Sequence, residues 1–134
     1  MNAKNRKLNA SAEWKKSTSA LLEAKLLLNE GFVEASISRS YYAAFHAAQT
    51  LLLTEGLETR SHQGVGKLFS LHFIKSGKML PKFSRILSNA QKHREEADYS
   101  SEYVFTKEDA ENELTAAQDF VATAEAYLKE HHYL

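Results

Sequence analysis

The 134-residue chain contains no cysteine, which excludes disulfide bonds, thiolate metal sites and cysteine nucleophiles. The absence of cysteine is typical of proteins in a reducing compartment, so we expect a cytoplasmic protein. Apolar runs such as residues 51–53 fall far short of the roughly 20 residues that a membrane span needs. Residues 1–8 are polar and basic and lack the apolar segment of a signal peptide.

Proline and glycine are also scarce, with one proline and five glycines in the chain. Such a sequence favours long unbroken elements over many turns. Its length is that of one domain, so we expect a single helical domain over residues 1–134, in which residues 1–10 are flexible.

Apolar residues recur at steps of three and four along most of the chain, which is the spacing of one face of an α-helix. Thr106 and Asp109 resemble a capping box, and Gly31, Gly56 and Gly77 stand where helices would end. The pattern predicts five helices, at about residues 11–29, 32–55, 62–76, 81–97 and 106–129.

The segment 32–55 carries two adjacent apolar stripes, which predicts burial over more than half of its circumference. Its many alanines would allow neighbouring helices to approach closely. We therefore expect an all-α protein, an up-and-down four-helix bundle with this helix at its centre and one short additional helix.

Acidic residues are absent from residues 60–94, which carry eight Lys or Arg. Residues 1–59 have a formal charge of +1 and residues 95–134 a charge of −9, so the net charge of zero hides a strong segregation. A long segment without carboxylates is a candidate surface for an anion such as RNA. Packing of the basic segment against the acidic one would explain the same pattern.

Arg39 and His46 are seven residues apart in the central segment, so both side chains leave nearly the same helix face, about 10 Å apart along its axis. Cleavage of RNA by its own 2′-hydroxyl needs a group that moves protons near pH 7 and a cation on the phosphate. Histidine supplies the first and arginine the second. On spacing alone, a buried arginine ion pair beside a hydrogen-bonded core histidine is the better explanation.

Two later segments hold further candidate residues. Residues 93–99 (HREEADY) place Arg94 and Asp98 four apart, where Arg94 could hold a phosphate or simply pair with Asp98 on the helix surface. Residues 61–66 (SHQGVG) place two glycines at a helix start, which suits either anion binding or a cap with tight packing. The six histidines form no metal-binding pattern, and we expect neither a metal nor a cofactor.

Taken together, these segments resemble a known family. Residues 38–48 (SRSYYAAFHAA) are similar to the central helix of HEPN domains (higher eukaryotes and prokaryotes nucleotide-binding). Residues 61–65 and 94–99 resemble the two later motifs of a small, stand-alone prokaryotic branch of that superfamily, in the same order along the chain. The resemblance covers about residues 11–129.

The resemblance implies a helical bundle that forms homodimers and a toxin-like role beside a minimal nucleotidyltransferase. In many HEPN proteins an Arg-x4–6-His motif, completed across the dimer, makes a metal-independent ribonuclease. Arg39 and His46 fit this spacing. The family's motif usually lies on the later helix, however, where this chain has Arg94 followed by Tyr99 in place of the histidine.

Three functions therefore stay open. The first is a ribonuclease with Arg39, His46 and Arg94 as catalytic residues. The second is a non-catalytic, dimeric nucleotide-binding or adaptor module for the nucleotidyltransferase, which could modify the hydroxyl of Tyr99. The third is a plain homodimeric scaffold. For the first two we expect contacts to RNA or a nucleotide from five residues: His62, Lys67, His93, Asp98 and Tyr99.

Overall fold

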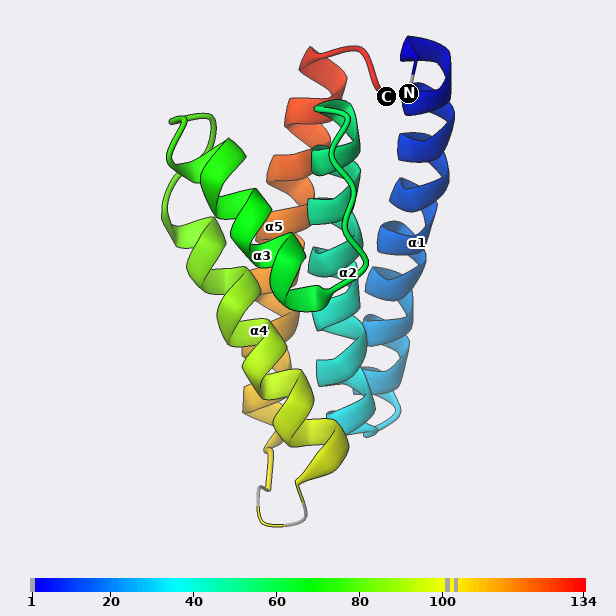
Figure 1. Ribbon diagram of the computed structural model, residues 1–134. Helices are drawn as coiled ribbons and strands as arrows, with labels where there is room; N and C mark the ends of the chain where they lie inside the picture. The colour runs from blue at the N-terminus through cyan, green and yellow to red at the C-terminus, as the bar shows by residue number, and fades with distance from the viewer. Residues whose placement is uncertain (1, 101, 103) are drawn as a thin grey trace.

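The computed structural model describes residues 2–100, 102 and 104–134, and these form a helical bundle without strands (Figure 1). This confirms the expected all-α fold. The long helices alternate in direction along the chain, and the two termini lie at the same end (Figure 1). The elements are α1 (Ala3–Asn29), α2 (Val33–Thr54), α3 (His62–Phe69), a π-helical turn η1 (Ser70–Ile74), α4 (Lys82–Tyr99) and α5 (Lys107–Glu130).

The first helix begins at Ala3, well before the expected start near residue 11. The Asn2 side chain caps it by accepting a 2.9 Å hydrogen bond from the Asn5 amide, and Ala10 is buried. Of the segment 1–10, which we expected to be flexible, residues 3–10 are therefore part of α1, and Met1 lies outside the described residues. None of the helices in the described part of the chain is long and apolar enough to cross a membrane.

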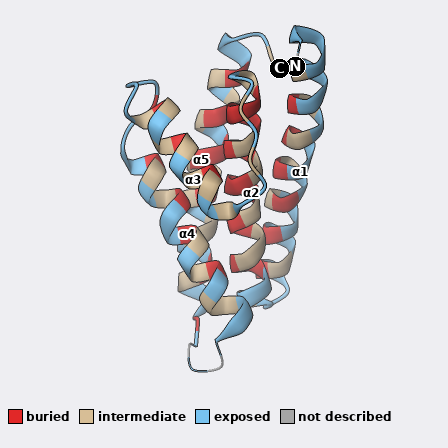
Figure 2. Cartoon of the chain, in the orientation of Figure 1, coloured by how far each residue is buried: buried red, intermediate tan, exposed pale blue. Residues whose placement is uncertain are grey.

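Helix α2 lies at the centre of the bundle, with buried residues along its length (Figure 2). The four alanines that predicted close approach, Ala43, Ala44, Ala47 and Ala48, are fully buried. Two buried serines join α1 and α2: Ser17 donates a 2.7 Å hydrogen bond to the carbonyl of Ala43, and Ser36 donates a 2.8 Å bond to that of Ala24. The bundle core therefore forms around this helix.

The expected third helix is present as α3, which continues into η1. Ser61 is its N-cap, since its hydroxyl accepts a 2.8 Å hydrogen bond from the Gly64 amide. A Cβ atom at Gly64 would lie 2.5 Å from both Ser61 Oγ and Thr59 Oγ1. Glycine at this position thus permits the tight packing that carries the chain from the loop into α3.

The basic segment is partly neutralised by packing. Lys82 pairs with Asp119 of α5 at 2.9 Å, and His93 hydrogen-bonds to Glu113 of the same helix. Helix α4 ends at Tyr99 rather than near residue 97. The capping box of α5 is present at Thr106 and Asp109.

Candidate functional site

The ring of Tyr42 brings together the three predicted catalytic residues. The Arg39 guanidinium lies 4.6 Å from the ring centroid, the Arg94 guanidinium 5.6 Å, and the His46 ring centroid 6.0 Å. Arg39, Tyr42 and His46 come from α2, whereas Arg94 comes from α4. We call this group, together with Tyr41 and His62, the tyrosine cluster.

Arg94 is the buried cation of the tyrosine cluster, with 8% of its surface exposed. Its guanidinium lies 5.4 Å from the Tyr41 ring and 5.8 Å from the Tyr99 ring. One guanidinium nitrogen pairs with Asp98 at 3.5 Å, but the buried Nε has no hydrogen-bond partner among the described residues. A buried donor on a permanent charge normally has an acceptor, so the arrangement suits an anionic ligand.

His62 is held by Tyr41 of the central helix. The Tyr41 hydroxyl lies 2.5 Å from His62 Nδ1, and the His62 ring stacks on Phe45 at 4.3 Å. Burial raises the pKa of Tyr41 and, with the nearby charge of Arg94, lowers the pKa of His62. Tyr41 therefore stays protonated and donates to Nδ1. Neutral His62 then carries its own proton on Nε2, where it can donate to a ligand.

His46 is oriented by a carboxylate from α1. Its Nδ1 lies 2.6 Å from Oε1 of Glu13. Burial raises the pKa of Glu13, but its interactions with His46 and Lys16 outweigh burial, so the pKa lies below its usual value. The ionised carboxylate accepts the Nδ1 proton. The other ring nitrogen, Nε2, has no hydrogen bond among the described residues, so neutral His46 could accept a proton there.

Arg39 lies at the exposed edge of the tyrosine cluster. It forms a 3.8 Å ion pair with Glu23, and 35% of its side chain is exposed. A shallow depression of about 320 Å³ runs from Arg39 and His46 to Lys15 and Lys16 of α1. Arg39 therefore forms an ion pair, as the structural interpretation of the sequence expected, but it is not buried.

The other predicted binding residues lie at different places. Asp98 and Tyr99 belong to the end of α4 beside Arg94, and the Tyr99 side chain is 78% exposed. Lys67 lines a separate groove between α3 and α4, and His93 faces Glu113 of α5. The structure thus groups His62, Asp98 and Tyr99 with the three predicted catalytic residues, but leaves Lys67 and His93 outside this group.

Sequence reasoning missed two parts of the site. Tyr41 and Tyr42 lie within the apolar stripes of residues 32–55, and that pattern alone predicts a core role for them. Glu13 contributes from a helix 33 residues away from His46, and no local spacing signals that contact.

Comparisons with known proteins show which family the chain resembles. The family model described as "HEPN domain" matches residues 10–130. A protein of Methanocaldococcus jannaschii named "Putative toxin" is 36% identical over 110 residues, which are 82% of this chain and 81% of that protein. A second protein of that name from the same organism is 31% identical over 84% of this chain and 77% of its own length. The "UPF0332 protein" of Thermotoga maritima is 28% identical over 87% of this chain and 88% of its own length.

Proposed function

Since this chain belongs to the HEPN domain family, we propose that it is the toxin-like partner of a minimal nucleotidyltransferase in the cytoplasm and that its tyrosine cluster binds the phosphate of RNA or of a nucleotide. The proposed assembly includes a homodimer. The names of the two archaeal relatives support the toxin-like role, and the tyrosine cluster supports the phosphate site.

One observation supports the phosphate site: Arg39, Arg94 and His46 all contact the Tyr42 ring, and the buried Nε of Arg94 has no hydrogen-bond partner in the described part of the chain. Guanidinium groups bind phosphate through paired N–H donors. The rings of Tyr41 and Tyr42 hold the arginines in place through cation–π contacts. A phosphate between the two arginines would complete the hydrogen bonding of Arg94.

The same arrangement suits metal-independent cleavage of RNA. In this reaction the 2′-oxygen attacks the adjacent phosphorus and the bond from phosphorus to the 5′-oxygen breaks. His46 Nε2 accepts the 2′ proton, while water protonates the departing 5′-oxygen. The arginines stabilise the negative charge that develops on the phosphate oxygens. Glu13 is a positioning residue, because it keeps the Nδ1 proton in place and directs Nε2 outward.

A second function draws support from the end of α4, where the exposed Tyr99 stands beside Arg94. The chain would then be a non-catalytic nucleotide-binding adaptor for the nucleotidyltransferase, and the accessible Tyr99 hydroxyl could receive a group from that partner. Both functions use the same phosphate site, and they differ in whether RNA is cut.

The decisive experiment is digestion of end-labelled RNA by the purified full-length protein in EDTA. The wild type is compared with His46→Ala, Arg94→Ala and the control Arg85→Ala, which removes an exposed arginine elsewhere on α4. If the protein is a ribonuclease, the wild type and the control variant should cleave the RNA, and both site variants should leave it intact. Intact RNA that binds in an Arg94-dependent manner would favour the adaptor. Absence of both cleavage and binding would refute the phosphate site.

A further inference from the structure

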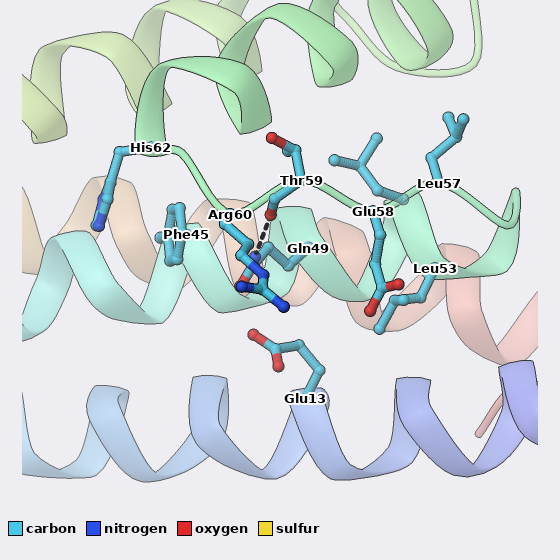
Figure 3. Close-up of a pocket in the computed structure, with 10 residues that line it drawn as sticks. Glu13, Phe45, Gln49, Leu53, Leu57, Glu58, Thr59, Arg60 and His62 are labelled. Carbon is cyan, nitrogen blue, oxygen red and sulfur yellow. Dashed lines mark hydrogen bonds between the residues drawn. The ribbon is translucent and has the colours of Figure 1, made fainter.

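A cavity of about 490 Å³ opens between α1, α2 and the loop that leads into α3. Figure 3 shows Arg60 extending from this loop toward Glu13 on α1, with Phe45 and His62 at one end and Leu53 and Leu57 at the other. Its volume is within the range of small-molecule sites.

The cavity shares His62 with the phosphate site and adjoins it through Glu13. His62 lines it and also accepts the hydrogen bond from Tyr41. Glu13 lines it and also holds His46 through Oε1. The cavity is therefore next to the proposed phosphate position, where the rest of a bound ligand could enter it.

The lining has two kinds of surface. Leucines and Phe45 form apolar walls, whereas Gln49, Glu58 and Arg60 supply polar groups. The Gln49 amide nitrogen donates a 3.3 Å hydrogen bond to the carbonyl of Thr59, which holds the amide at the wall. Its oxygen has no hydrogen bond among the described residues, so it is able to accept one from a ligand.

We propose that this cavity is a nucleobase subsite, which receives the base attached to the phosphate bound at the tyrosine cluster. The assignment rests on the proposed phosphate site. A nucleobase has flat apolar faces and an edge of hydrogen-bond donors and acceptors, and these match the two kinds of lining. A purely apolar ligand such as an acyl chain is disfavoured, because it would strip water from Glu13 and Arg60 without replacing their hydrogen bonds.

The test uses isothermal titration calorimetry in EDTA with the full-length protein. Nucleoside 5′-monophosphates are compared with ribose 5-phosphate, which keeps the phosphate but lacks the base. At least one nucleotide should bind about tenfold more tightly than ribose 5-phosphate, which corresponds to about 1.4 kcal/mol. A short RNA and the same RNA with abasic residues, titrated in parallel, distinguish a base within an RNA chain from a free nucleotide.

Two variants address the cavity without touching the arginines of the phosphate site. Leu57→Arg places a long side chain in the cavity from a half-buried position. Arg60→Ala removes a polar group from the cavity wall, and because Arg60 is exposed this change should leave folding intact. Both should abolish the preference for the base while leaving the affinity for ribose 5-phosphate unchanged. Arg85→Ala, which makes the same charge change as Arg60→Ala outside the cavity, should behave as wild type.

The outcomes separate this inference from the proposed function. If ribose 5-phosphate and abasic RNA bind as tightly as their base-containing counterparts, and Arg94→Ala weakens all of them, the base subsite is wrong and the phosphate site stands. A base preference that survives both cavity variants also overturns the assignment. If no phosphate ligand binds to the wild type, both proposals fail.

Discussion

Tyr41 on the central helix donates a 2.5 Å hydrogen bond to Nδ1 of His62, the first residue of α3. This contact joins two elements that the sequence separates by a loop. It also determines which nitrogen of His62 carries the proton. The proposed phosphate site and the proposed base subsite meet at this histidine.

The pH dependence of folding should report on His62. Its pKa in the folded protein is lowered, by burial first and then by the charge of Arg94, whereas the unfolded value is about 6.5. Between these two pKa values the unfolded chain binds more protons, so this contribution to stability is present above about pH 6.5 and is lost as the pH falls through the folded pKa.

Urea midpoints of the wild type should therefore rise between pH 5 and pH 7 more than those of His62→Phe. An exposed-histidine control, His131→Phe, should keep the wild-type pH slope, and an unchanged slope in His62→Phe would contradict the assignment.

Arg94 should dominate the electrostatics of nucleic-acid binding. Arg94 is buried among aromatic rings, and one of its N–H groups has no partner among the residues that the structure describes. Arg94→Ala should therefore weaken binding of a short RNA by about tenfold or more and reduce the salt dependence of the affinity. Fluorescence anisotropy over a range of salt concentrations measures both effects. Arg85→Ala serves as the matched control, and equal losses in the two variants would point to diffuse surface charge instead.

Glu13 should act on the rate of RNA cleavage rather than on RNA binding. Glu13→Gln keeps the side-chain shape but removes the carboxylate that orients His46, so kcat should fall about tenfold or more while KM changes little. The pH profile of kcat should shift as well, which a purely structural role would not produce. Glu23→Gln, which removes the exposed partner of Arg39, is the comparison. A fall in kcat that is equal in the two variants would argue against a special role for Glu13.

The two glycines of α3 should respond oppositely to alanine. Gly64→Ala places a Cβ against Ser61 Oγ and Thr59 Oγ1, which disturbs the N-cap and should cost about 1 kcal/mol or more in the free energy of unfolding. At Gly66 a new Cβ would have no described residue within 4 Å, so Gly66→Ala should stabilise the helix by about 0.5–1 kcal/mol. Urea denaturation followed by circular dichroism measures both, and effects of the same sign would refute the prediction.

The packing of α1 on α2 should not tolerate a larger side chain at Ala43. This residue is fully buried where Ser17 contacts its carbonyl, so Ala43→Leu should cost about 1–3 kcal/mol through overpacking. Ala126→Leu makes the same change at an exposed position of α5 and should alter stability little. Thermal unfolding of the two variants provides the comparison. Equal midpoints would mean that the interface between α1 and α2 can adjust.

Sequence periodicity was sufficient to predict the helical bundle and the positions of most helix ends. The apolar stripes of residues 32–55 predicted the buried central helix, and Thr106 with Asp109 predicted the start of α5. Periodicity did not predict that residues 3–10 belong to the first helix, because the apolar pattern there is weak. The Asn2 cap and the burial of Ala10 stabilise this part of the helix.

The candidate site was predicted only in part. Residue type and the family resemblance identified Arg39, His46 and Arg94, but their spacing alone favoured isolated structural roles. Tyr42 belonged to an apolar stripe and was assigned to the core. Nothing in the sequence marked Glu13 as a site residue, because acidic residues are common on the solvent-facing side of helices.

The sequence by itself determined the helices, the burial of the central one and the segregation of charge, because these depend on residues within a few turns of each other. Only the tertiary structure decided that Arg94 of α4 meets Arg39 and His46 at the Tyr42 ring, and that Glu13 of α1 orients His46. Those contacts arise from how whole helices rotate and pack against one another. Such rotations are set by the fit of many buried side chains together, and no local spacing encodes them.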